Sequence, residues 1–255
     1  MYKIGLKVGS INTKYTEEIH ELYEKGIFQY IELFVPFGSY KETINYWKQY
    51  NIPFGIHAPH TAAGLNLASY ENRTANKAKI EETIQFADSL KAEYVIFHSG
   101  TNGESEEVVH QLKPYTDSRF LIENKPIKGF GGDFICVGTG YEELKGIIDG
   151  LGCGFCLDFG HAICAANTEK KDPMAFISEL MKLNPRVFHL TDGDYYSEID
   201  SHYHYGAGTF PLKELLQFVP EGGMITNEAK RDDMTTLKEF YQDSINIRKY
   251  YKSEK

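Results

Sequence analysis

Aspartate and histidine gather in one short segment of the chain. The sequence DSHYHYGAG runs from Asp200 to Gly208 and holds an aspartate, two histidines and two glycines within nine residues. Carboxylates and imidazoles together form the ligand sets that zinc, manganese and iron use in proteins. A polar surface loop with chance histidines would show the same letters. Whether this segment belongs to a metal site therefore depends on which similar residues the rest of the chain brings to it.

Residues of the same kinds also stand at the ends of apolar segments elsewhere in the chain. With Asp200 and His202 they make a set of nine, whose other members are His57, His98, Glu123, Asp158, His161, His189 and Glu228. Any one of them alone is more simply a hydrogen-bonded core residue or half of an ion pair. Burying several carboxylates and imidazoles together is costly unless a cation offsets their charge. A divalent metal ion supplies that charge, so the whole set predicts a metal site.

Apolar segments of strand length alternate with helical patterns along the chain. Eight strand candidates begin at Lys3, Tyr30, Phe54, Tyr94, Arg119, Gly154, Arg186 and Gly223. Most are apolar without alternation, as in a parallel sheet that is covered on both faces. In the sixth unit the helix is expected at residues 172–183. The 255 residues show no linker-like break. They predict a single α/β domain over residues 1–255, a (βα)8 TIM barrel with its active site at the C-terminal ends of the strands.

Composition narrows the classes further. The net charge of −9 disfavours a broad basic face for nucleic acid, although a local basic groove stays open. The C-x-x-C pair Cys153 and Cys156 lies in an apolar segment without a second pair, which predicts buried thiols. No apolar run is long enough for a bilayer, and the first residues lack a signal-peptide pattern. We therefore expect a cytoplasmic protein that does not bind membranes. A doubly wound sheet is the alternative fold, but no Gly-rich phosphate turn follows the first strand.

Several motifs together resemble the endonuclease IV family, the type-2 apurinic-site endonucleases among the xylose isomerase-like barrels. IHAPHTAAGLNLAS resembles the family's HAPY…NLAS, YVIFHSG its VFHPG, and LIENKP its LLEN. GFCLDFGHA resembles GVCLDTCHA, VFHLTDGD resembles HLNDS, and DSHYHYGAG resembles DRH…IG.G. The similarity runs from Phe54 to Lys230, and the motifs keep the family's order.

The resemblance implies a metal cluster, with two or three zinc ions, or with Mn²⁺ or another divalent ion instead. It distributes the nine residues over three positions, of which the first and second share a glutamate: His57, His98 and Glu123; Glu123, Asp158, His189 and Glu228; and His161, Asp200 and His202. Gly206 and Gly208 would let the backbone turn close to the third position. His60 and His204 match no ligand position and are assigned to substrate binding.

Phosphoester hydrolysis is the first functional hypothesis. Clustered metal ions activate water near neutral pH and stabilise the charge on a phosphoryl group. Glu123 or Glu228 would orient the attacking oxygen, which makes both catalytic candidates. The substrate would be a phosphodiester such as an abasic site in damaged DNA, or a smaller phosphorylated molecule. His60 stands where the family has tyrosine, and the rim loops carry few Lys or Arg for phosphate contacts. These departures count against a DNA substrate.

Sugar isomerisation or epimerisation is the alternative. Relatives of this barrel bind one divalent ion through four strand-end residues, which here are Glu123, Asp158, His189 and Glu228. Glu123 and Glu228 would then act as acid and base. Lys125 and Lys230, two residues beyond these glutamates, could bind a substrate phosphate or carboxylate. The five other ligand-type residues have no role in an isomerase and favour hydrolysis. A non-catalytic binding module ranks last, because no ligand is missing, and no protein partner is predicted.

Overall fold

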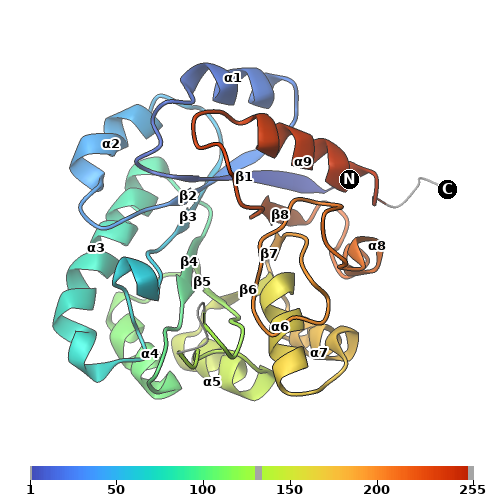
Figure 1. The fold of residues 1–255 in the computed structure, drawn as a ribbon. Helices are drawn as coiled ribbons and strands as arrows, with labels where there is room; N and C mark the ends of the chain where they lie inside the picture. The colour runs from blue at the N-terminus through green and yellow to red at the C-terminus, as the bar shows by residue number, and fades with distance from the viewer. Residues whose placement is uncertain (1, 130–133, 252–255) are drawn as a thin grey trace.

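Eight parallel strands close into a barrel in the computed structural model, which describes residues 2–129 and 134–251 (Figure 1). The strands are β1 (Lys3–Gly9), β2 (Tyr30–Phe34), β3 (Phe54–His57), β4 (Val95–His98), β5 (Phe120–Glu123), β6 (Gly154–Asp158), β7 (Val187–Leu190) and β8 (Met224–Asn227). Each strand pairs with the next in the chain, and β8 pairs with β1 to close the barrel. The predicted (βα)8 architecture is confirmed.

Helices surround the barrel and connect successive strands (Figure 1). The α-helices are α1 (Thr16–Glu24), α2 (Tyr40–Trp47), α3 (Arg73–Leu90), α4 (Ser105–Leu112), α5 (Tyr141–Leu151), α6 (Phe159–Thr168), α7 (Pro173–Leu180), α8 (Leu212–Leu215) and α9 (Lys238–Arg248). Short 3₁₀ turns are η1 (Thr61–Ala63), η2 (Tyr70–Asn72), η3 (Lys113–Tyr115) and η4 (Met181–Leu183). The last helix lies beside the first, next to the seam between β8 and β1 (Figure 1). None of the described helices has the length and apolar character that crossing a bilayer requires.

The sixth unit differs from the prediction, because two helices follow β6. The helix expected at residues 172–183 is present as α7, but α6 begins directly after the strand. The Asp158 carboxylate caps α6 by accepting a hydrogen bond of 2.7 Å from the backbone N–H of His161. Residues 159–166 of α6 are all buried, so the helix lacks the one-sided apolar pattern that identifies a surface helix. Its position matters because it carries His161 into the barrel mouth.

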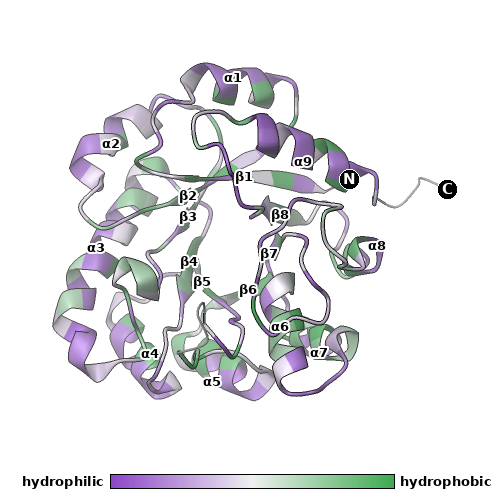
Figure 2. Cartoon of the chain, in the orientation of Figure 1, coloured by the Kyte–Doolittle hydropathy of each residue, from purple (hydrophilic) through white to green (hydrophobic). Residues whose placement is uncertain are grey.

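Two tyrosines fill the barrel below its C-terminal ends. A Cβ atom at Gly5 would lie 2.3 Å from the Tyr30 ring, and one at Gly55 would lie 2.1 Å from the Tyr94 ring. Glycine is therefore required at both positions for the rings to enter. The apolar sides of the surrounding helices pack against the strands, while their polar sides face outward (Figure 2). The result is a rigid barrel whose filled interior supports the side chains above it.

Candidate metal centre

The strand ends bring the predicted metal ligands to one end of the barrel. Four of them are the last residues of consecutive strands β3 to β6: His57, His98, Glu123 and Asp158. Glu228 follows the last residue of β8. In the ladder, His98 is the partner of Glu123, and Asp158 is the partner of His189. Parallel pairing therefore sets these side chains next to one another before any loop contributes.

Glu123 lies at the centre of the group and is fully buried. Its Oε2 atom is 3.2 Å from Nε2 of His57, 3.2 Å from Nε2 of His98 and 3.3 Å from Nδ1 of His189. Its Oε1 atom is 3.1 Å from Nδ1 of His161. One carboxylate thus contacts four imidazoles, which is the arrangement expected of a ligand shared between two ions.

A second group joins α6 to the loop between β7 and α8. Asp200 Oδ2 is 3.5 Å from Nε2 of His161 and 2.7 Å from Nε2 of His202. The other ring nitrogens of the histidines are directed at backbone carbonyls, at 2.9 Å for His161 to Asn124 and 3.0 Å for His202 to Glu228. These bonds fix the ring orientations, as partners of metal-binding histidines commonly do. The loop therefore completes a candidate position that the strands alone do not form.

The remaining predicted position consists of Glu123, Asp158, His189 and Glu228. Asp158 also groups with Glu123 and His161 on the side facing α6. His189 Nδ1 lies 2.7 Å from Oε1 of Glu228 on the other side. All nine predicted ligands are thus at the same end of the barrel. The His57–His98–Glu123 and His161–Asp200–His202 groups each keep their ligand atoms within 4.8 Å of one another.

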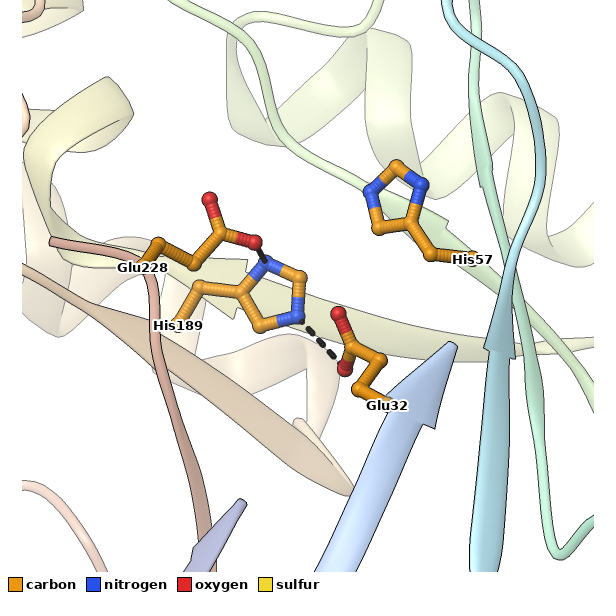
Figure 3. A group of neighbouring side chains, drawn as sticks. All are labelled: Glu32, His57, His189 and Glu228. Atoms are coloured by element: carbon orange, nitrogen blue, oxygen red, sulfur yellow. Dashed lines mark hydrogen bonds and ion pairs between the residues drawn. The ribbon is translucent and has the colours of Figure 1, made fainter. Parts of the chain in front are cut away.

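Two charged residues that the sequence prediction missed complete the cluster. Glu32 in β2 holds Nε2 of His189 at 3.0 Å, and Figure 3 shows His189 lying between Glu32 and Glu228, with His57 opposite. Lys7 in β1 forms an ion pair with Glu228, and its Nζ atom lies 3.4 Å from Oε1 of Glu32. Both lie inside their strands, whereas the predicted ligands stand at strand ends or in the loops that follow them. Their signal was a charged residue within an otherwise apolar strand.

Buried polar atoms test whether divalent ions fit here. His98 Nε2, Glu123 Oε1 and His189 Nδ1 are inaccessible to solvent and make no well-directed hydrogen bond, although acidic or imidazole groups lie close by. Glu32 Oε1 is also buried and makes no hydrogen bond with any described residue. Buried groups of this kind are normally paired, and exceptions require an explanation such as an ion. Mixed imidazole and carboxylate donors suit zinc or manganese, so the residues fit such a metal.

The charges of the central residues are strongly perturbed. Burial would raise the pKa of Glu123, but the charges on His98 and His189 outweigh it and hold this pKa well below the usual range. Burial also opposes ionisation of Glu228, yet His189 and Lys7 lower the pKa of its carboxyl group. Both glutamates are therefore anionic. Their negative potential attracts cations to this end of the barrel.

The second group shows the same balance. Burial would raise the pKa of Asp200, but the neighbouring His202 lowers it to about 2. Burial would lower the pKa of His202, but Asp200 raises it to about 9. Burial raises the pKa of Asp158 to about 6, and nearby carboxylates act in the same direction. The nearby carboxylates thus make it unfavourable to ionise Asp158. A bound cation would offset this effect.

A cavity of about 830 Å³ opens directly over these residues. Three of the four predicted substrate-binding residues line it, namely His60, Lys125 and Lys230. The His60 ring stacks on Phe34 with centroids 5.3 Å apart, and burial lowers its pKa to about 4. Lys125 Nζ lies 3.2 Å from Nε2 of His161, while Lys230 is exposed.

The fourth predicted substrate-binding residue, His204, is placed elsewhere. Its Nδ1 atom lies 2.8 Å from Oδ2 of Asp243 in α9. Among the residues that the structure describes, the cavity lining does not include His204. The structure thus places His204 against α9 and not in the lining of this cavity.

Asp192 holds the loop that carries Asp200 and His202. Its carboxylate accepts backbone N–H bonds from Gly193 at 2.8 Å, Gly206 at 2.8 Å and Phe210 at 3.0 Å. Gly206 has a φ of +88°, and a Cβ atom at Gly208 would lie 2.4 Å from the Gly193 carbonyl oxygen. Both glycines therefore allow the close turn that the sequence predicts.

The chain is similar in sequence to known proteins. The family model described as "Xylose isomerase-like TIM barrel" matches residues 20–250. A protein of Thermoplasma volcanium named "Probable endonuclease 4" is 32% identical over 167 residues, which cover 58% of this chain and 57% of that relative. The chain thus aligns with little more than half the length of this curated relative.

Solved structures show the same barrel. A D-tagatose 3-epimerase-like protein superposes with a TM-score of 0.71 at 22% identity and covers 96% of each chain. Endonuclease IV from Thermus thermophilus superposes with a TM-score of 0.71 at 21% identity and covers 97% of each chain. The resemblance predicted from the motifs is confirmed. The chain belongs to the xylose isomerase-like TIM barrel family.

Proposed function

We propose that this protein is a metal-dependent phosphoester hydrolase of the endonuclease IV type. The observation that carries the proposal is the convergence of five residues that a single-ion isomerase does not need: His57, His98, His161, Asp200 and His202. Two of the candidate ligand groups are built mainly from them. The 32% identity to a protein named as an endonuclease 4 supports the same reaction class.

The chain's own residues would divide the work. Glu123 holds two ligand groups together, and Glu228 lies at the cavity wall where it can orient an attacking water molecule. Divalent ions, zinc in our proposal, would when bound supply the Lewis-acid chemistry that activates water and offsets phosphoryl charge. Lys125 and Lys230 line the cavity and would bind phosphate oxygens. The His60–Phe34 stack offers a flat surface to a base or sugar.

The cavity favours a compact phosphorylated substrate. Its volume of about 830 Å³ lies within the range of small-molecule sites. The net charge of −9 opposes a long polyanion, although a single extruded abasic nucleotide of damaged DNA would still enter. We therefore rank a small phosphomonoester or phosphodiester first and an abasic site in DNA second.

Sugar isomerisation or epimerisation is the second candidate function. Glu123 and Glu228 both lie next to Nδ1 of His189, at 3.3 Å and 2.7 Å, and two carboxylates this close could act as an acid and base pair around one ion. The structural similarity to a D-tagatose 3-epimerase-like protein fits this alternative, but at 22% identity it supports only the fold. The extra ligand groups still favour hydrolysis.

A substrate panel separates the two functions. The zinc-loaded and manganese-loaded protein would be incubated with abasic-site duplex DNA, with aryl phosphate mono- and diesters, and with a set of ketoses. We expect metal-dependent release of aryl alcohol or cleavage of the DNA. Interconversion of ketoses without any phosphoester cleavage would contradict the hydrolase, and activity on none of them would contradict both proposals.

The compartment is also part of the proposal. The four cysteines are free thiols, and Cys136, Cys156 and Cys164 are buried. Free thiols are usual in a reducing environment, which supports the cytoplasmic location expected from the sequence.

A further inference from the structure

Lys7 places an ammonium group among the carboxylates of the cluster. It lies in β1, and its side chain is 21% exposed, while the side chains of Glu32 and Glu228 are 0% and 7% exposed. Its Nζ atom forms an ion pair with Oε1 of Glu228 and lies 3.4 Å from Oε1 of Glu32. The chain therefore supplies a positive charge of its own at this point.

Strand pairing places Lys7 beside Glu32. Lys7 and Glu32 are partners in the ladder between β1 and β2, so both side chains point into the barrel at the same level. The other oxygen of Glu32 already accepts hydrogen bonds of 2.8 Å from the hydroxyls of Tyr94 and Thr226, and lies 3.0 Å from His189. Glu32 is thus rigid, and its free oxygen faces Lys7. The ammonium cannot leave without exposing two buried carboxylates to each other.

The same ammonium contacts Glu228, which is a predicted ligand at the position of one of the ions. That position requires Glu228 and His189, and the two are joined through Oε1 of Glu228, which lies 2.7 Å from Nδ1 of His189. Lys7 pairs with this same oxygen. A divalent ion and an ammonium that share one carboxylate oxygen would repel each other strongly in a buried site. The other two ligand groups contain neither Glu228 nor Glu32.

We propose that the Lys7 ammonium takes the place of the second divalent ion, so that the cluster binds two ions rather than three. The two remaining positions are His57, His98 and Glu123, and His161, Asp200 and His202. This inference rests on the metal dependence proposed above. Lys7 also lines the cavity. A phosphoryl oxygen that approaches Glu228 therefore meets an ammonium donor at this point of the site.

Counting bound ions tests the proposal without any substrate. Protein stripped with a chelator would be dialysed against excess Zn²⁺, freed of unbound ion, and analysed for zinc and protein by elemental analysis. We expect two ions per chain in the wild type and in Lys7→Arg, which keeps the positive charge. We expect a third ion in Lys7→Met, which removes the charge and frees Glu228. Lys3→Met is the matched control, because Lys3 is an exposed lysine of the same strand, and it should bind two ions.

Several results would overturn the inference. Three ions in the wild type would do so without any variant, as would fewer than two. A count of two in Lys7→Met with an unchanged circular dichroism spectrum would show that the ammonium does not exclude an ion. Should Lys7→Met fail to fold, Lys7→Gln tests the same charge. If the protein binds two ions but cleaves no phosphoester, this inference holds and the proposed hydrolysis is wrong. If it binds three ions and cleaves phosphoesters, the hydrolysis holds and this inference is wrong.

Discussion

Glu123 holds the candidate site together at the scale of single residues. Its two oxygens contact imidazoles from β3, β4, β7 and α6, and no other described acid touches as many. If an uncharged amide replaced this carboxylate, the four histidines would lose the one anion that they all contact. The function of the cluster should therefore depend on this carboxylate more than on any single histidine.

Replacing Glu123 with Gln should leave the barrel folded but weaken metal binding at the site. Glutamine has nearly the same shape, yet it offers one neutral acceptor where two anionic oxygens are needed. We expect loss of at least one bound ion and a fall in hydrolysis of about 10²-fold or more. Elemental analysis and initial rates measure both. Glu107→Gln is the control, because that buried acid pairs with Arg73 outside the cluster. Full activity in Glu123→Gln would rule out the shared ligand.

His57 and His98 separate the two candidate functions. Each lies 3.2 Å from Glu123, but neither belongs to the four residues that an isomerase would use. If the protein is a hydrolase, His57→Ala and His98→Ala should each weaken the binding of one ion and slow phosphoester cleavage. We expect a decrease of about 10-fold to 100-fold in metal affinity or in cleavage rate. Metal content and cleavage rates measure the effect, with the exposed His110→Ala as control. Unchanged metal content together with ketose interconversion would favour the isomerase.

At the scale of elements, strands and loops contribute differently to the site. The strand ends are set by the closed ladder and need no further support. The loop between β7 and α8 has no regular structure of its own, and it carries Asp200 and His202. The Asp192 carboxylate holds the loop instead, because it accepts hydrogen bonds from three of the loop's backbone N–H groups. The geometry of one ligand group therefore depends on a residue that contributes no ligand to it.

Asp192→Asn should weaken only the ligand group on this loop. An amide cannot accept on both sides, so one or two buried N–H groups would lose their partner, at a cost of about 1–3 kcal/mol in the free energy of unfolding. We expect metal affinity at the His161–Asp200–His202 group to fall about 10-fold to 100-fold while one ion stays bound tightly. Zinc titration and thermal unfolding measure both effects. Asp194→Asn in the same loop should change neither, since Asp194 is exposed. Two tight sites in Asp192→Asn would contradict this role.

The sequence predicts the elements that are regular and misses those that are not. Strand ends could be predicted because short apolar runs break off at polar residues, and this located His57, His98 and Glu123. Helix α6 was missed because its residues 159–166 are all buried and its pattern has no polar side. Lys7 and Glu32 were missed because they lie inside strands, and their pairing appears only when β1 and β2 are set in register. His204 was assigned to substrate because it matches no ligand position, and its contact with Asp243 appears only when α9 packs against the loop.

At the scale of the whole molecule, the barrel confines five buried or nearly buried carboxylates to one end: Glu32, Glu123, Asp158, Asp200 and Glu228. Cations that bind these carboxylates only in the folded chain add to its free energy of unfolding. Stability should therefore depend on metal, and removing the ions by chelation tests this dependence across the entire fold.

Zinc should raise the melting temperature of the stripped protein in a concentration-dependent way. One ion at a hundredfold excess over its dissociation constant adds about 2.7 kcal/mol. For a chain of this size each kcal/mol shifts the midpoint by about 2–4 °C, so one site raises it by about 5–10 °C. Thermal unfolding followed by circular dichroism across a zinc series measures the shift, and Mg²⁺, which prefers oxygen ligands, should give a smaller one. Glu123→Gln should lose most of the shift, because that carboxylate joins the ligand groups. If zinc does not change the melting temperature of the wild type, the charges of the cluster are balanced by the protein's own residues. That result would also contradict the metal-dependent function.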